Sequence, residues 1–162
     1  HLCVDYCESI TDAGLHHISE RCHGLLGLGI YISEMGPITT AAIQELLRVN
    51  PLLQEVRLQW EEEDADVLLT TLAESCPQLR HLNIYGLSDY TEVGVMAVMT
   101  ACSRLRTVVV DPDCTVINPL AQCLWRKYCS PEVQFVDDED EDEDSRRMRP
   151  FWTQYRSLEF YC

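Results

Sequence analysis

The sequence has few positive charges, with 12 Lys and Arg against 27 Asp and Glu and a net charge of −15. A protein that binds the nucleic-acid backbone needs a basic footprint, so we expect no nucleic acid among the partners. No apolar run approaches the roughly 18 residues of a membrane span, and the N-terminus shows no charged-then-apolar leader. We therefore expect no membrane partner and an intracellular, cytoplasmic or nuclear, location.

The motifs of catalysis and metal binding are also missing. The sequence contains no phosphate-binding glycine loop, no Gly-x-Ser-x-Gly elbow and no paired-histidine metal helix. Its 9 cysteines include no CxxC pair, and His16, His17, Cys22 and His23 have no second ligand pair that would complete a zinc site. We therefore predict a binding protein rather than an enzyme, with no catalytic residues, no cofactor and no metal.

One short phrase returns every 26 to 28 residues, and an internal repeat of this period indicates a solenoid. The phrase begins with cysteine or asparagine and continues, three residues later, with leucine. Copies begin at Cys22, Asn50, Cys76 and Cys102, and a looser one begins at Cys129. Because asparagine takes the place of cysteine in one copy, the recurring cysteines favour reduced, partly buried thiols over disulfides.

Apolar residues also recur around each phrase, with strand alternation after it and helical spacing before it. The strand pairs are Leu2/Val4, Leu28/Ile30, Val56/Leu58, Leu82/Ile84, Val108/Val110 and Val133/Phe135. The helix pairs are Leu15/Ile18, Ile43/Leu46, Leu69/Leu72 and Val95/Val98. A threonine precedes three of the helices, at positions 11, 39 and 91, where its side-chain oxygen is expected to cap the first free amides. One strand and one helix cannot bury their apolar faces alone, so we predict an α/β fold in which about five stacked units share a continuous core.

The residues described so far resemble cysteine-containing leucine-rich repeats of the type found in the substrate-receptor half of F-box proteins. The family's phrase Ile-Thr-Asp-x-Gly-Leu occupies residues 10 to 15, its closing Cys-x-x-Leu occupies residues 22 to 25, and residues 76 to 79 repeat the closing words as Cys-Pro-Gln-Leu. The resemblance implies a right-handed α/β horseshoe, a leucine-rich-repeat solenoid with parallel strands on its concave face. It also implies a role, common in the family, in presenting targets to a ubiquitin ligase.

Composition divides the chain into three predicted segments. Residues 1–135 hold the leucine-rich repeats. Residues 136–149 form an acidic linker that is expected to be disordered, because its run of eight carboxylates at 137–144 repels itself and cannot bury anything. Residues 150–162 hold five of the chain's thirteen aromatic residues. Two roles are open for the linker, a solubilising spacer or a segment that attracts basic partners. Two roles are also open for the aromatic segment, which either caps the last repeat or docks on another protein.

The outward-facing positions of the predicted strands, with their flanking residues, supply a candidate binding surface on the concave face. Tyr, Trp and Arg are enriched at binding hot spots, and several occur here. The candidate partner-binding residues are Tyr31, Arg57, Gln59, Trp60, His81, Asn83, Tyr85 and Asp111. The alternative interpretation is that they are ordinary solvated positions, since any such solenoid exposes side chains on this face.

Two functions remain open. The first is the substrate-binding part of an F-box-type ubiquitin ligase receptor, with a protein substrate on the concave face. The second is a scaffold or adaptor that uses the same repeats without ubiquitin, as in cytoskeletal, ciliary or immune-type leucine-rich proteins. The F-box that would bind the ligase adaptor is absent from this chain, which begins in mid-strand without Met. We therefore expect the chain to be part of a longer protein.

Overall fold

The chain forms one parallel sheet backed by helices in the computed structural model, which describes residues 1–5, 7, 9–31, 38–59, 65–84, 87, 90–109 and 134–136. The six described strands are β1 (Leu2–Asp5), β2 (Gly27–Tyr31), β3 (Glu55–Gln59), β4 (His81–Asn83), β5 (Thr107–Val109) and β6 (Gln134–Val136). The four described helices are α1 (Asp12–Ser19), α2 (Thr40–Arg48), α3 (Ala65–Ser75) and α4 (Glu92–Ala101). The predicted α/β class is confirmed.

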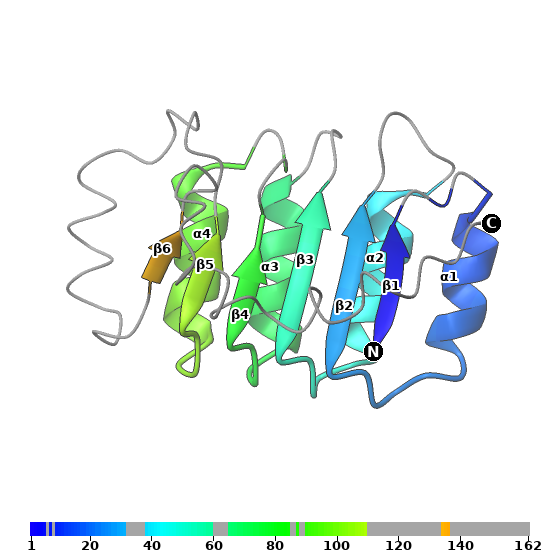
Figure 1. Cartoon of the computed structure of the whole chain (residues 1–162), viewed down its shortest axis with the longest axis horizontal. Coiled ribbons are helices and arrows are strands. Elements are labelled where there is room, and N and C mark those ends of the chain that lie inside the picture. Colours follow the sequence, from blue (N-terminus) through cyan, green and yellow to red (C-terminus); the bar gives the residue numbers. More distant parts are fainter. Residues whose placement is uncertain are drawn as a thin grey trace, which may run out of the picture.

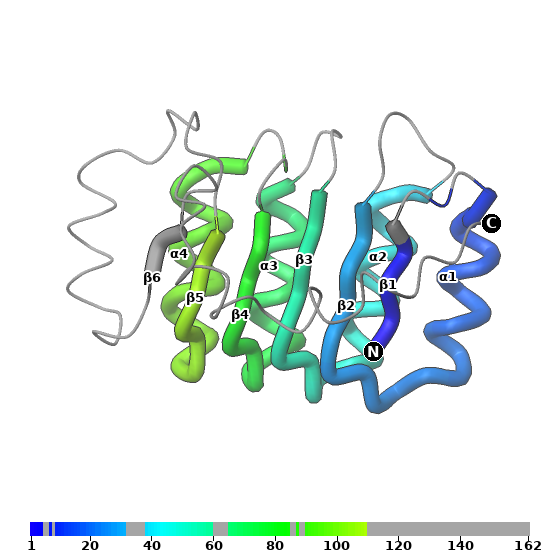
Figure 2. Tube along the Cα trace, viewed as in Figure 1, coloured from blue at the N-terminus to red at the C-terminus, as the bar shows by residue number. Residues whose placement is uncertain are grey.

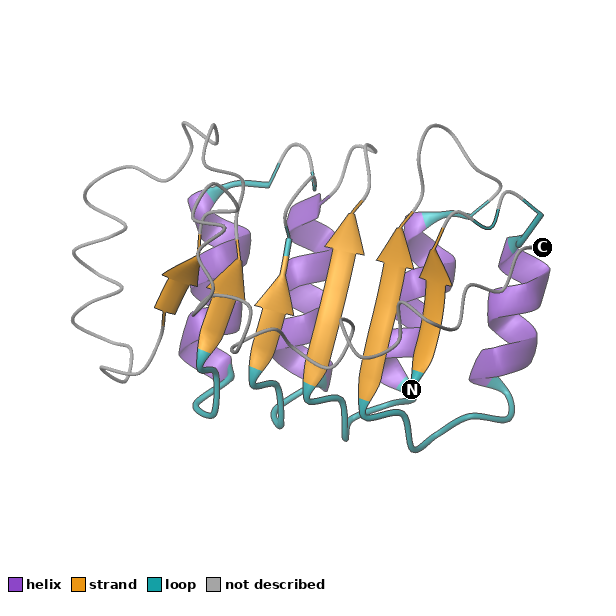
Figure 3. Ribbon diagram, in the orientation of Figure 1, coloured by secondary structure: helices purple, strands orange, loops and turns teal. Residues whose placement is uncertain are grey.

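The strands lie side by side in the order of the sequence, and all of them run in the same direction (Figure 1). After each described helix, the chain returns to the end of the sheet where the previous strand began, and the next strand lies beside that one (Figure 2). The helices form a second layer on one face, where α1 packs against α2, α2 against α3, and α3 against α4 (Figure 3). Within the described ranges, no helix or strand covers the opposite face.

The strand register reproduces the period of the sequence. Along one row, the lateral partners are Leu2, Leu28, Val56, Leu82, Val108 and Phe135. Each step along this row spans 26 to 28 residues. The period is therefore the chain length that separates lateral neighbours in the sheet.

The core lies between the sheet and the helices. Every predicted inward strand residue whose burial is described is buried, except Leu2, which packs against the core while partly exposed. The helix pairs are buried as well, with Ile18 partly so. Val110 and Val133 lie outside the described residues. The predicted alternation and helical stripes are therefore confirmed in the described part of the chain, and each fully buried Leu, Ile or Val contributes about 1.5 to 3 kcal/mol.

Two of the three predicted threonine caps are present. The side-chain oxygen of Thr39 accepts a hydrogen bond from the backbone N–H of Ala42 at 3.4 Å, and that of Thr91 accepts one from Val93 at 3.1 Å. The prediction for Thr11 was wrong, because its side chain makes no capping hydrogen bond. An aspartate from the preceding helix orients each of the two capping threonines, whereas no described helix precedes α1 to do the same for Thr11.

These aspartates connect neighbouring units at the beginnings of their helices. Asp12 accepts hydrogen bonds from the backbone N–H of Thr39 at 2.7 Å and from its hydroxyl at 2.9 Å. Asp66 accepts the same two bonds from Thr91. Each capping threonine therefore joins two helices, since it also receives a backbone N–H of its own helix.

Asn50 connects neighbouring units at the other end of the helix layer. Asn50 is fully buried, its Nδ2 donates to the carbonyl of Leu46 at 2.9 Å, and its Oδ1 accepts from the backbone N–H of Leu25 at 3.0 Å. The amide thus satisfies one carbonyl of its own helix and one N–H of the preceding unit. A buried polar side chain is stable here because both of its ends are hydrogen-bonded.

The equivalent cysteines make weaker contacts of the same kind. The thiol of Cys76 lies 3.9 Å from the carbonyl of Leu47 and 4.0 Å from that of Asn50, and the thiol of Cys102 lies 3.5 Å from the carbonyl of Cys76. Burial, with a contribution from Cys102, raises the pKa of Cys76 to about 12, and burial raises the pKa of Cys102 to about 11. Both thiols are therefore protonated at neutral pH. The cysteines of the described repeated phrases, Cys22, Cys76 and Cys102, are free thiols, as predicted from the repeat.

We expect Asn50→Ala to lower the free energy of unfolding by about 2 to 3 kcal/mol, because it leaves the buried N–H of Leu25 without a partner and also removes the bond to Leu46. Urea unfolding followed by circular dichroism measures this loss. Arg48→Ala, an exposed change on the same helix, is the control and should stay within about 0.5 kcal/mol of the parent. Equal stabilities for the two variants would contradict the proposed role of Asn50.

Candidate functional site

The face of the sheet opposite the helices, called the open face below, carries lateral rows of residues. The first row contains Gly27, Glu55, His81 and Thr107, and the second contains Cys3, Gly29, Arg57, Asn83 and Val109. Tyr31 and Gln59 are partners in a third row. Alternation along each strand keeps these rows apart from the core-facing rows.

Five of the predicted partner-binding residues come together on this face. Tyr31 lies on β2, Arg57 and Gln59 lie on β3, and His81 and Asn83 lie on β4. All five are partly buried, so each presents some of its surface to solvent. The other three, Trp60, Tyr85 and Asp111, lie outside the described residues.

The first row holds two residues that the sequence did not single out, Glu55 and Thr107. Nδ1 of His81 lies 3.2 Å from the hydroxyl of Thr107. Glu55, the partner of His81 on its other side, has one carboxylate oxygen, Oε2, that is buried without a hydrogen-bond partner. The repeat period could have identified both residues, because each lies 26 residues from His81 and faces the same side of the sheet by alternation.

Two arginines stand at the edge where β4 and β5 begin. Arg80 and Arg106 occupy equivalent places in successive units, each directly after the leucine that closes the repeated phrase. The backbone N–H of Arg106 donates to the carbonyl of Arg80 at 2.7 Å, and that of Arg80 donates to Gln54 at 2.7 Å. The two positions are therefore lateral neighbours.

The surroundings shift the pKa of both titratable groups in the first row. Burial lowers the pKa of His81, and the charges of Arg106 and Arg80 lower it further. Burial raises the pKa of Glu55. His81 is consequently neutral at pH 7, so the positive charge in this region belongs to the arginines.

The combination of Glu55, His81 and Thr107 invites comparison with a hydrolytic triad. Such a triad needs a carboxylate that hydrogen-bonds to the histidine ring and orients it toward the nucleophile. The structure records no hydrogen bond between Glu55 and His81, and Oε2 of Glu55 has no partner at all. Glu55 and His81 therefore do not form the carboxylate–histidine pair of such a triad.

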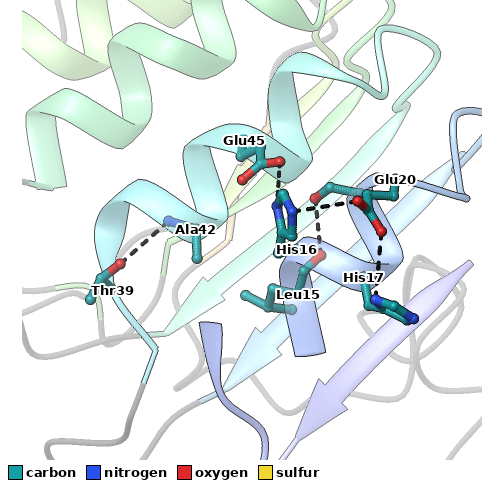
Figure 4. Close-up of polar contacts among 8 residues, drawn as sticks. Leu15, His16, His17, Glu20, Thr39, Ala42 and Glu45 are labelled. Atoms are coloured by element: carbon teal, nitrogen blue, oxygen red, sulfur yellow. Dashed lines mark hydrogen bonds and ion pairs between the residues drawn. The ribbon is translucent and has the colours of Figure 1, made fainter. Parts of the chain in front are cut away.

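A second polar cluster joins α1 to α2 (Figure 4). Nδ1 of His16 lies 2.9 Å from Glu45, and its Nε2 lies 3.6 Å from Glu20, which also lies 3.5 Å from Nδ1 of His17. Across the described part of the chain, no group of three or more His, Cys, Asp or Glu side chains is arranged to hold a metal ion. We interpret the cluster as a contact between exposed helix surfaces.

A groove of about 280 Å³ lies on the helix layer between α2 and α3, and it is a weaker candidate than the open face. Gln44, Arg48, Asp66, Val67, Thr70, Thr71 and Glu74 line it. Some of its polar groups already form hydrogen bonds within the protein, since Gln44 donates to Thr71 at 2.7 Å and Asp66 accepts from the backbone N–H of Thr91. Its lining also has no aromatic anchor of the kind that concentrates binding energy.

Comparison with known proteins finds no matching family model and no matching curated protein. The described helices are too short, or too polar, to cross a membrane. The functional interpretation therefore depends on the residues and geometry of the open face.

We expect Glu55→Gln to raise the free energy of unfolding at pH 7 by about 0.5 to 1 kcal/mol, because it removes a charge from an oxygen that has no partner. The raised pKa means that the folded state favours the protonated carboxyl. The stability associated with this group is thus fully present below the ordinary pKa of 4.5 and is lost as pH rises through the folded-state pKa. The advantage of the variant should therefore vanish toward about pH 4.

Urea unfolding at both pH values measures this effect. Glu74→Gln, at an exposed position on α3, is the matched control and should change stability by less than about 0.5 kcal/mol at either pH. A Glu55→Gln variant less stable than the parent at pH 7 would show that the carboxylate has a stabilising partner.

Proposed function

We propose that this chain is a protein-recognition module of the leucine-rich-repeat type that binds its partner on the open face. The observation that carries the proposal is the one-sided arrangement of the layers. All described helices lie behind the sheet (Figure 3). Strand register and alternation place Tyr31, Arg57, Gln59, His81 and Asn83 on the opposite face. A partner that covered this face would meet an aromatic ring, a guanidinium and amides on adjacent strands, which are groups suited to specific contacts.

The repeat geometry supports the leucine-rich-repeat assignment. Successive strands pair in parallel at intervals of 26 to 28 residues, and the cysteine or asparagine of each described phrase, at positions 22, 50, 76 and 102, follows the end of a helix. Leucine-rich repeats place one strand and one helical segment in each unit of 20 to 29 residues. We extend the proposal to a right-handed horseshoe of about five repeats, in which the open face is the concave one.

The cysteine-containing form of the repeat supports a more specific proposal, that the chain is the substrate-binding part of an F-box-type ubiquitin ligase receptor. On this proposal, the open face holds the protein substrate, and an F-box outside this chain binds the ligase adaptor. The full-length gene provides the test. Co-purification of a ligase adaptor with the full-length protein would support this proposal. A full-length protein without an F-box would contradict it and would favour the alternative, a scaffold that recognises its partner without ubiquitin.

Photo-crosslinking tests the binding face directly. We expect a benzophenone amino acid at Gln59, on the open face, to crosslink a protein partner in cells, because the partner must approach that strand. The same amino acid at Glu74, exposed on the helix layer, is the control and should give no adduct of that mass. Gel mobility and mass spectrometry identify the adducts.

Equal yields of the same adduct from both positions would place the partner elsewhere and contradict the proposal. Adding Tyr31→Ala and Asn83→Ala to the Gln59 variant should remove most of the adduct if these residues hold the partner. Circular dichroism spectra of the variants establish that each of them is folded.

A further inference from the structure

We infer that the outer side of the first unit, which consists of β1 and α1, is a docking surface for one further strand–helix unit, supplied by the preceding part of the protein, whose helix holds Thr11 through an aspartate. This side is called the end face below, and it carries Leu2, Ile10, Thr11, Ile18 and Cys22. The inference goes beyond the proposed function and does not depend on it.

The end face leaves partly exposed a set of apolar side chains whose places the second unit buries. Four side chains pack against the core while partly exposed, those of Leu2, Ile10, Ile18 and Cys22. The residues in the same places of the second unit are at most 2% exposed, and they are Leu28, Ile38, Leu46 and Asn50. The second unit differs from the first in having a described unit on each side. The first unit therefore has the packing surface of an inner unit, without a described neighbour to cover it.

The composition of the end face differs from that of a unit that ends a stack. A terminal repeat needs a polar outer face to stay soluble. Here the outer side presents the aliphatic side chains of Leu2, Ile10 and Ile18 instead. Burial of such side chains against another apolar surface is favourable, as it is between the described units.

Thr11 takes the place of a threonine that is held from the preceding unit. Thr39 and Thr91 cap their helices, and each is hydrogen-bonded to an aspartate of the helix before. These aspartates, Asp12 and Asp66, lie 27 and 25 residues before their threonines. Thr11 begins α1 with the same extended backbone, yet its side chain makes no capping hydrogen bond. We therefore expect the docking unit to carry an aspartate at the beginning of its helix, 25 to 27 residues before Thr11.

Cys22 begins the first copy of the repeated phrase, and each described counterpart of Cys22 contacts the unit before its own. The amide of Asn50 accepts from the backbone N–H of Leu25. The thiol of Cys76 lies 4.0 Å from the carbonyl of Asn50, and the thiol of Cys102 lies 3.5 Å from the carbonyl of Cys76. The same arrangement, shifted back by one unit, places the thiol of Cys22 against the docking unit.

The edge of the sheet identifies the kind of occupant. β1 is the first strand in the order of the sheet, and among the described strands it pairs with β2 alone (Figure 1). Strands β2 to β5 each pair in parallel on both sides. The partly exposed apolar side chains belong to both layers, since Leu2 lies on β1 and Ile18 on α1. A single peptide strand would cover only the first of these, whereas a strand–helix unit continues the interface that the described units already form.

Alkylation of Cys22 tests the inference by comparing this chain with the full-length protein. Labelling with iodoacetamide, followed by peptide mass spectrometry, gives the reaction rate of each cysteine. We expect Cys22 to react about tenfold or more slowly in the full-length protein, because the docking unit buries its thiol and buried thiols are inert. The variant Glu74→Cys, changed at an exposed position on α3, supplies the matched control thiol, which should react at the same rate in both forms.

Hydrogen exchange of the backbone amides, measured in the same two forms, tests the nature of the docking unit. Exchange across β1 should be about tenfold or more slower in the full-length protein, since a parallel strand pairs with β1 there. Thr11→Ala should speed exchange across α1 about fivefold in the full-length protein and less than about twofold in this chain alone, where Thr11 forms no cap. Thr39→Ala is the control and should speed exchange across α2 in both forms, because Asp12 holds Thr39 in each.

Equal alkylation rates of Cys22 in the two forms, or an equal effect of Thr11→Ala in both, would overturn the inference. Protection of Cys22 without slower exchange across β1 would overturn it too, by showing that something other than a strand–helix unit covers the end face. Two other occupants would be recognised in this chain alone. Protection of Cys22 that increases with protein concentration would indicate a second copy of the chain, and protection that is lost on deletion of residues 150–162 would indicate the aromatic segment. Either result would overturn the inference.

Discussion

Each strand–helix unit of this chain has an apolar side that only the neighbouring unit can cover, and the rest of the structure depends on this constraint. Leu28, Val56, Leu82 and Val108 meet along one row, and each is almost fully buried. The residues that meet lie 26 to 28 positions apart in the chain, so no unit can complete its core from local contacts. Stability is therefore a property of neighbouring pairs of units.

Hydrophobic contact alone would permit units to slide against one another, and the hydrogen bonds between units oppose this. The Asp12–Thr39 and Asp66–Thr91 contacts hold the beginnings of helices, and Asn50 connects the ends. A slip of two residues would keep the inward-facing side chains of a strand on the core side, but it would break these bonds together. The polar contacts thus select one register among those that the apolar pattern could accept.

The sequence was sufficient to predict the layers because the repeat period and the two apolar periodicities agree. Leu82 and Ile84 alternate as a half-buried strand, while Leu69 and Leu72 mark a helical stripe, and all four are buried. The pattern could not show which carboxylate reaches which threonine. Thr11, Thr39 and Thr91 look alike in sequence, yet only the last two cap with their side chains, because that depends on an aspartate of the previous helix.

The candidate site was only partly predictable, for a related reason. Alternation identified Arg57 and His81 as outward-facing, but Arg80 and Arg106 precede their strands, so the period of two does not assign them a face. Their common environment depends on the lateral bond between the two backbones. Sequence places residues along a strand more reliably than it shows which charges on different strands meet.

The open face also carries a polar group whose surroundings differ from those of Asn50. The amide of Asn50, between two units, is hydrogen-bonded at both ends, whereas a buried oxygen of Glu55 lacks a partner. A locally unfavourable group persists when the surrounding structure can tolerate its cost, and such exceptions to local consistency concentrate at functional positions. Substitution of an outward-facing residue leaves the core rows untouched, because alternation places the two sets on opposite sides of the sheet. Residues of this face can therefore change without disturbing the contacts between units that hold the fold together.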